Sequence, residues 1–205
     1  MAGGFDRAHE RDDHAQEGAV VVPLHGPDFV ARQAPPGPPA PLHEQADPVT
    51  GLPGVEQFEE YLAGAARRRR GDEHAWAAVA VLEGLTVVGD REGRQSAEAL
   101  LCAAAMTLRA ALRDSDKLAR LGDEEFGLLI DAPFGDEAMT VLARLVHQVK
   151  KLSDSRPAWY GVTLSVGVTQ LWSDKPRRAV ERAREALYGV RRHGGGGVAM
   201  STGLR

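Results

Sequence analysis

Hydrophobic residues recur with two different periods from Asp47 onward, and these periods predict helices and strands in turn. In "VEQFEEYLAGAARRRR" the apolar residues recur every three or four positions, which predicts an amphipathic helix. Its buried face would carry Val55, Phe58, Leu62 and Ala65. The run "WAAVAVLEGL" is continuous and of strand length, so it predicts a strand buried on both faces.

A long buried helix is predicted next, in "SAEALLCAAAMTLRAALRD", with Ser96 as its N-cap and Glu98 in its first turn. The stretch "RLGDEEFGLLI" then predicts a hairpin, in which a short strand, a tight turn at Gly122-Asp123 and a second strand follow one another.

The second half of the chain repeats the alternation. The stretch "DEAMTVLARLVHQVKKL" carries Met139, Leu142, Val146, Val149 and Leu152 at helical spacing, which predicts a helix. The β-branched "WYGVTLSVGVTQL" predicts a strand, and "PRRAVERAREALYGVRRHGGGG" predicts a helix that begins at a proline and ends at a glycine run. This order predicts an α+β fold with a ferredoxin-like β-α-β-β-α-β core, an antiparallel sheet of four or five strands with helices on its faces.

The periodic region has a differently composed segment before it. Residues 1–46 include the proline-rich "RQAPPGPPAPLHEQ", which predicts a disordered N-terminal arm. The apolar "AVVVPL" within it is too short to assign. We therefore expect an arm at 1–46, one domain at 47–200 and a flexible tail at 201–205.

Composition narrows the functional classes. The 205 residues carry a net charge of −4 and are 43% hydrophobic, so a core can form and nothing calls for nucleic acid as a partner. The single cysteine, Cys102, lies in an apolar run, which favours a small buried residue over a metal thiolate. No apolar run approaches the ~20 residues of a membrane helix, and no signal peptide is recognisable. We expect a cytoplasmic protein with no membrane contact.

Four motifs in order resemble those of the GGDEF domains, nucleotidyl cyclases that join two GTP molecules into cyclic di-GMP. "DPVTGLPGVEQF" is similar to the opening D-x-L-T-G-L-x-N-R-x-x-F, and "RLGDEEFGLLI" to R-Y-G-G-D-E-F-x-x-L-L. "TLSVGV" resembles the S-x-G-[VI] strand, and "RAREALYGVRRHG" resembles A-D-x-A-L-Y-x-A-K-x-x-G-R-N. The resemblance covers residues 47 to about 198 and implies a nucleotidyl cyclase-like fold.

The resemblance also implies a catalytic site in which carboxylates hold two divalent cations against the phosphates of GTP. Here Val81 replaces the first metal-binding aspartate, and a hydrocarbon cannot bind Mg²⁺. Glu83 follows two residues later on the same strand face. Thr86 replaces a lysine, and Gly89 replaces the asparagine that reads guanine. Residues of the GTP site that keep some family character are Glu83, Asp90, Glu98 and Arg191.

The signature turn departs from the pattern as well. It reads Gly122, Asp123, Glu124, Glu125 and Phe126, so an aspartate stands where the second glycine should be and adds negative charge near the phosphates. Glu124 keeps the metal-binding carboxylate. Gly195 stands where an arginine is expected. These losses predict that the chain is not an active cyclase and requires no cofactor; Mg²⁺ would matter only for residual cyclase activity.

A second family site is better preserved. Many members carry R-x-x-D five residues before the signature as a product-binding site, and Arg113 and Asp116 have that spacing. Arginine can donate to guanine O6 and N7, and a carboxylate can accept from N1 and N2. Arg144 matches the arginine that the family often adds from the following helix. The alternatives are a solvated helix end with a surface arginine, or a chance match such as Arg120 with Asp123.

We therefore expect a degenerate GGDEF domain that binds cyclic di-GMP through Arg113, Asp116 and Arg144 as an effector or adaptor. The ligand could bridge two protomers as a homodimer, and the arm could reach an unidentified protein partner. Two alternatives remain: a residual cyclase rebuilt from Glu83, Glu124 and Glu98, and a protein-interaction module that binds no nucleotide. The run Arg67–Arg70 and the histidines His147 and His193 are interpreted as solvated surface.

Overall fold

The computed structural model describes residues 20–22, 46–68, 74–171 and 176–201. Its elements follow the order β1(Val20–Val22), α1(Val55–Arg68), β2(Ala75–Glu83), α2(Leu85–Glu92), α3(Arg94–Ala111), β3(Lys117–Arg120), β4(Glu125–Asp131), α4(Gly135–Asp154), the 3₁₀ turn η1(Pro157–Trp159), β5(Thr163–Gln170), α5(Pro176–Arg192) and β6(Val198–Met200). The described strands form one six-stranded sheet in the order β1-β6-β5-β2-β4-β3.

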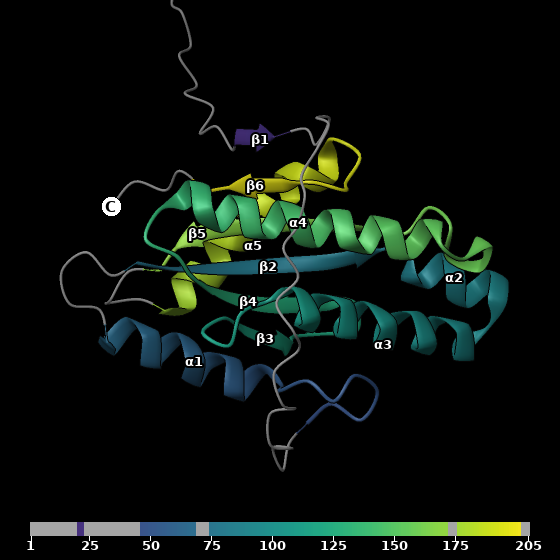
Figure 1. Cartoon of the computed structure of the whole chain (residues 1–205), viewed down its shortest axis with the longest axis horizontal. Helices are drawn as coiled ribbons and strands as arrows, with labels where there is room; N and C mark the ends of the chain where they lie inside the picture. Colours follow the sequence, from purple (N-terminus) through teal and green to yellow (C-terminus); the bar gives the residue numbers. More distant parts are fainter. Residues whose placement is uncertain (1–19, 23–45, 69–73, 172–175, 202–205) are drawn as a thin grey trace, which may run out of the picture.

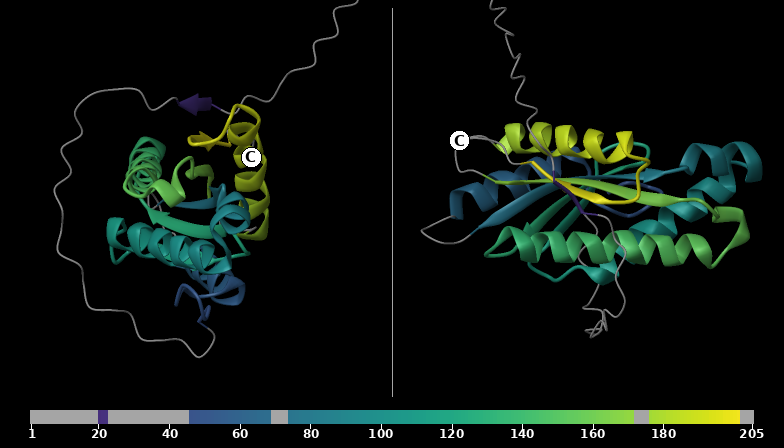
Figure 2. Two further views of the ribbon diagram at one scale, coloured as in Figure 1. Left: turned by 90° about the vertical axis from the view of Figure 1, so that its right-hand side faces the viewer. Right: turned by 90° about the horizontal axis from the view of Figure 1, so that it is seen from above.

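Strand β2 lies inside the sheet between β5 and β4, and its side chains alternate between two hydrophobic cores on opposite faces. Ala78, Ala80 and Leu82 face a core built with α3 and α4. Val79 and Val81 face the opposite side, where they pack with residues of α5. Figure 1 shows the strands side by side, and the left view of Figure 2 shows α3 and α4 on one side of the sheet with α5 on the other. Strand β2 is buried on both faces, as predicted.

Two glycines let the helices approach the sheet closely. A Cβ on Gly167 in β5 would lie 1.9 Å from the carbonyl oxygen of Ala183 in α5, and a Cβ on Gly127 in β4 would lie 2.7 Å from the ring of Phe58. Neither position has room for a methyl group. Gly167 therefore fixes how near α5 lies to the sheet.

The antiparallel ferredoxin-like core is confirmed. Strand β2 pairs antiparallel with β4 and β5, and β3 pairs antiparallel with β4 across the predicted hairpin. Strand β6, which was not predicted, adds to β5 in parallel. Val20–Val22, within the segment predicted as an arm, forms β1, which pairs antiparallel with β6. The rest of 1–45 and residues 202–205 lie outside the described part of the chain.

Two details of the predicted helices are wrong. The long helix begins at Arg94 after Gly93, so Ser96 lies inside it and caps nothing, and the separate helix α2 precedes it. A positive φ of 87° at Gly93 breaks the chain between the two helices, a conformation that glycine adopts without steric cost. Val55 is 49% exposed because it is the first residue of α1; Phe58, Leu62 and Ala65 are buried as expected.

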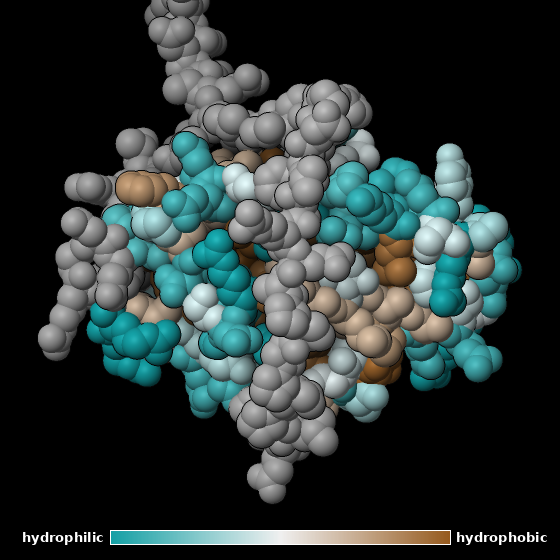
Figure 3. All heavy atoms as spheres, viewed as in Figure 1, coloured by the Kyte–Doolittle hydropathy of each residue, from teal (hydrophilic) through white to brown (hydrophobic). Residues whose placement is uncertain are grey.

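The structure tests some of the remaining predictions about surface residues and not others. Arg67 and Arg68 are exposed at the end of α1, and His147 and His193 are exposed, whereas Arg69 and Arg70 lie outside the described residues. Cys102 is half-buried rather than fully buried. Figure 3 shows the face of α3 and α4, where hydrophilic side chains predominate and apolar ones surface in a band across its right-hand half. No helix among the described residues is long and apolar enough to cross a membrane.

Candidate functional site

A cleft of about 750 Å³ lies where β2 ends, between α2, the first turn of α3, the β3–β4 turn and α5. Its walls include two predicted residues of the GTP site, Asp90 and Arg191, and the signature residues Gly122 to Glu125. Val81 also lines it. The cleft coincides with the site that the sequence motifs indicate, although the predicted Glu83 and Glu98 do not line it. Glu98 instead forms an ion pair with Arg94 at 2.6 Å.

The β3–β4 turn is held in shape by Arg120. Its Nε donates to the carbonyl of Gly122 and its Nη2 to that of Asp123, at 3.0 and 2.9 Å. Its Nη1 lies 2.7 Å from Asp47 Oδ2, so one guanidinium joins the signature turn to the start of the domain. Burial acts to raise the pKa of Asp47, but hydrogen bonds from Arg120 and Thr50 outweigh it and hold that pKa below its usual value.

A second arginine binds the carboxylate after the turn. Arg184 of α5 donates from Nε to Glu125 Oε1 at 2.8 Å and from Nη2 to Oε2 at 3.3 Å. This two-pronged geometry fixes the Glu125 carboxylate against α5. Phe126, the last signature residue, is fully buried in the α3–α4 core and is a packing residue.

Glu83 forms a third pair with Arg191, which lines the cleft. Arg191 Nη2 donates to Glu83 Oε2 at 3.3 Å, and Nε lies 2.9 Å from Oε1. The closer contact is an ion pair only: Oε1 is shielded from solvent and receives no hydrogen bond of acceptable angle from the described residues. Burial, together with the negative charges of Glu83 and Asp123, raises the pKa of Glu124, although Arg191 opposes the shift.

These residues do not fit the divalent cations that the motifs imply. Val81 is buried with Val79, Ala183 and Leu187 and offers no oxygen, whereas Mg²⁺ requires oxygen ligands. The Glu83 carboxylate is already paired with Arg191. Across the described ranges, no three acidic, histidine or cysteine side chains are placed to hold a metal ion.

The R-x-x-D segment lies after the C-terminal turn of α3. Asp116 is 1% exposed, and each of its oxygens accepts a backbone N–H at 3.0 Å, from Arg113 on one side and from Asp131 on the other. The Asp116 carboxylate thus fixes the loop, whereas the Arg113 side chain is exposed. Asp116 is therefore buried within the loop, and its predicted role in ligand binding stays a prediction.

Arg144 reaches the same place from α4. Its Nη2 donates to the carbonyl of Ala111, the last residue of α3, at 2.6 Å. Its Nε is buried and has no hydrogen-bond partner among the described residues. The structure therefore brings Arg113, Asp116 and Arg144 together at one end of α3, and we call this group the arginine site.

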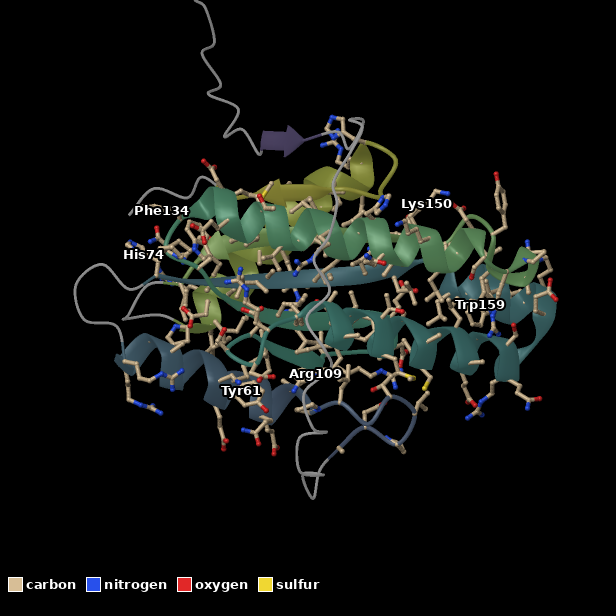
Figure 4. The ribbon with its side chains drawn as sticks, viewed as in Figure 1. Tyr61, His74, Arg109, Phe134, Lys150 and Trp159 are labelled. Carbon is tan, nitrogen blue, oxygen red and sulfur yellow. The ribbon has the colours of Figure 1, made fainter. Side chains whose placement is uncertain are left out.

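The cleft and the arginine site lie at opposite ends of α3. Arg94 and Ala97 in its first turn line the cleft, and Arg113 follows its last turn. With 18 residues at about 1.5 Å each, α3 separates them by roughly 27 Å. Arg109, labelled in Figure 4, marks the arginine-site end of the helix, with Tyr61 of α1 near it. Burial raises the pKa of Tyr61, and the positive charge of Arg109 opposes this.

Sequence reasoning missed three residues that shape the cleft: Arg94, Arg120 and Arg184. Arg184 precedes Arg191 by seven positions, which places both on one face of a helix, and this spacing was the available signal. No sequence signal indicated that Arg120 would span from the turn to Asp47, because the contact joins residues 73 positions apart.

Comparisons with known families and proteins agree with the fold and the motifs. The family model described as "Diguanylate cyclase, GGDEF domain" matches residues 44–196. Diguanylate cyclase DgcP of Pseudomonas aeruginosa is 32% identical over 151 residues, which are 72% of this chain and 22% of DgcP. Diguanylate cyclase TpbB of the same species is 28% identical over 156 residues, 73% of this chain and 36% of TpbB. The match thus spans well under half the length of these relatives.

Solved structures show the same architecture. The GGDEF domain of DgcB from Caulobacter crescentus, in complex with c-di-GMP, superposes with a TM-score of 0.72 over 78% of this chain and 98% of that one, at 22% identity. Diguanylate cyclase SiaD of Pseudomonas aeruginosa, in complex with its activator SiaC, gives a TM-score of 0.68 at 30% identity, over 77% of this chain and 62% of that one.

Proposed function

This chain belongs to the GGDEF family of diguanylate cyclase domains, and we propose that it binds cyclic di-GMP at the arginine site without synthesising it, as an effector or adaptor in signalling. The proposal has two parts, loss of the cyclase reaction in the cleft and retention of ligand binding at the other end of α3. Each part rests on different residues and has its own test.

Loss of catalysis follows from the contents of the cleft. The cyclase reaction needs a cation to neutralise the phosphates as one nucleotide attacks the other. Val81 supplies no ligand, and the Glu83 carboxylate is bound to Arg191. Asp123 adds a negative charge at the turn where phosphate would approach. Removing single groups of such a site costs about 3–4 kcal/mol of transition-state stabilisation each.

A turnover assay tests this part. The full chain is incubated with GTP and either Mg²⁺ or Mn²⁺, and the products are separated by chromatography. We expect no cyclic di-GMP above a protein-free blank. Steady accumulation of product that scales with protein concentration would establish a working cyclase and exclude the first part of the proposal.

Ligand binding rests above all on the unpartnered Nε of Arg144. A buried guanidinium N–H without an acceptor is costly, and a guanine or phosphate oxygen of a ligand would satisfy it. Arg113, two residues after the Ala111 carbonyl that Arg144 binds, is exposed and can donate a fork of hydrogen bonds to guanine O6 and N7. That DgcB is described in complex with c-di-GMP supports this choice of ligand.

Asp116 contributes first by holding the loop that presents Arg113. Its two oxygens each retain a lone pair beyond the bond to a backbone amide. Because the residue is 1% exposed, acceptance from guanine N1 and N2 requires the loop to open. The exposed Arg113 therefore provides the first contact, and the buried Nε of Arg144 and the Asp116 carboxylate follow as the loop opens.

Calorimetric titration of variants tests this part. Arg113→Ala and Arg144→Ala should each weaken cyclic di-GMP binding about tenfold to hundredfold, the value of a bidentate arginine–base contact. Arg178→Ala is the matched control, since this exposed arginine of α5 lies on the other side of the sheet. Equal affinities for all three variants would show that cyclic di-GMP does not bind at the arginine site. A homodimer bridged by the ligand would appear as a ligand-dependent doubling of mass in light scattering.

A further inference from the structure

The divalent cations that the family motifs imply do not fit this cleft, but the negative charges of Glu83 and Glu124 are still present. Glu83 ends β2 and Glu124 lies on the β3–β4 turn, and the two segments meet where the backbone N–H of Leu82, the residue before Glu83, donates to the carbonyl of Glu124 at 2.9 Å. Two carboxylates in a partly buried site repel each other unless a positive charge lies between or beside them. The question is what supplies that charge in this chain.

Arg191 is the positive group in contact. Its guanidinium forms an ion pair with Glu83 through Nε at 2.9 Å and through Nη2 at 3.3 Å, and Arg191 lines the same cleft as Glu124. Glu83 Oε1 is shielded from solvent behind this guanidinium, so an approaching cation cannot reach it without displacing Arg191.

The same helix provides a second positive group for the turn. Arg184, two helical turns before Arg191 on α5, binds both oxygens of Glu125. Gly167 lets the backbone of α5 at Ala183 and Leu187 approach β5 closely, and Arg184, next to Ala183, reaches the acidic turn. Helix α5 thus pairs Arg191 with Glu83 at the end of β2 and Arg184 with Glu125 in the cleft wall.

We propose that Arg191 is a built-in counter-cation, which takes the place of divalent metal between β2 and the signature turn and closes the cleft to metal ions. The cleft would then keep its shape without metal, and the domain would be insensitive to divalent cations. This inference concerns the cleft and is independent of ligand binding at the arginine site. A titration with cyclic di-GMP therefore tests the arginine site alone, and a titration with metal tests the cleft alone.

The test is to remove the charge and ask whether a metal ion takes its place. Arg191→Met keeps an apolar chain of similar length but leaves Glu83 and Glu124 without their counter-ion. Arg192→Met is the matched control, because it removes the same charge one position later, where the side chain is exposed and lies 5.9 Å from the ring of Tyr188. Mn²⁺ is the probe. Its binding is measured by the loss of the electron paramagnetic resonance signal of free Mn²⁺, and its effect on stability is measured by thermal unfolding.

The full chain and R192M should show no Mn²⁺ binding and no change of Tm with Mn²⁺. R191M should bind Mn²⁺, with Tm rising by about 3–5 °C at a Mn²⁺ concentration roughly ten times Kd. The double variant E83Q/R191M should lose this gain, because one carboxylate is then absent. In case R191M does not fold without metal, Arg191→Gln provides a neutral amide that can still donate to Glu83, and it should show the same gain.

Two results would overturn the inference. If the unmodified chain binds Mn²⁺ as tightly as R191M, the guanidinium does not exclude metal. If both R191M and R191Q fold yet gain no Mn²⁺ binding, Arg191 does not stand where a cation would be held.

Discussion

Asp116 offers the sharpest test of how the arginine site is built. Its carboxylate accepts the backbone N–H groups of Arg113 and Asp131, and Asp116→Ala would leave both amides without an acceptor in a buried loop. A hydrogen bond to a charged group contributes about 1.5–3 kcal/mol. Two such bonds total about 3–6 kcal/mol, and partial relaxation of the loop should reduce the loss to about 3–5 kcal/mol.

That loss should be visible by thermal and urea unfolding. For a domain of about 150 residues, each kcal/mol lowers Tm by roughly 2–4 °C, so Tm of the Asp116→Ala variant should fall by about 6–20 °C. Asp114→Ala is the control, because this neighbouring aspartate is exposed and its change should stay within about 0.5 kcal/mol. If Asp116→Ala costs no more than the control, the carboxylate does not hold the loop, and the reasoning about how Arg113 is presented is wrong.

Two further predictions concern the cleft side of the sheet. Gly167→Ala should destabilise the domain by about 3 kcal/mol in urea denaturation, because its methyl group would overlap the Ala183 carbonyl. Gly89→Ala is the control and should cost little, because its methyl group would lie at an ordinary 3.6 Å from the Cβ of Ala97. Equal losses of stability in the two variants would contradict the close approach of α5 to the sheet. Glu124→Gln should raise Tm at neutral pH. The pKa of Glu124 is raised in the folded state, so the folded protein binds this proton more tightly than the unfolded chain does. Ionisation of Glu124 therefore destabilises the fold as pH rises past the ordinary pKa of glutamate, and glutamine avoids this loss. The gain should vanish in acid, where the parent carboxyl is protonated in both states, and a gain that persists there would have another cause.

Much of the fold follows from local pattern. The helical face of Phe58 and Leu62 and the doubly buried β2 depend on periodicity alone, and both are as predicted. The break at Gly93 was missed, because the apolar spacing continues across it and a positive φ leaves no trace in hydrophobicity. Strand β6 was missed because a three-residue strand is too short to show a period.

The sequence predicted several residues of the candidate site, but it did not predict which of them bind one another. Motif spacing identified Glu83, Glu124 and Arg191 as members of one cleft, because each position has a counterpart in the family pattern. It could not indicate that Arg191 would bind Glu83, 108 positions away, or that Asp116 would spend both oxygens on backbone amides. Such contacts depend on side-chain direction and burial, which exist only once the elements are packed.

The central claim is that this GGDEF domain binds the product of its family without making it. The most direct measurement is a calorimetric titration of the full chain with cyclic di-GMP in the presence of a metal chelator, beside an identical titration with GTP. We predict saturable binding of cyclic di-GMP at micromolar concentration and no binding of GTP. Absence of heat with cyclic di-GMP, or tight binding of GTP alone, would contradict the account.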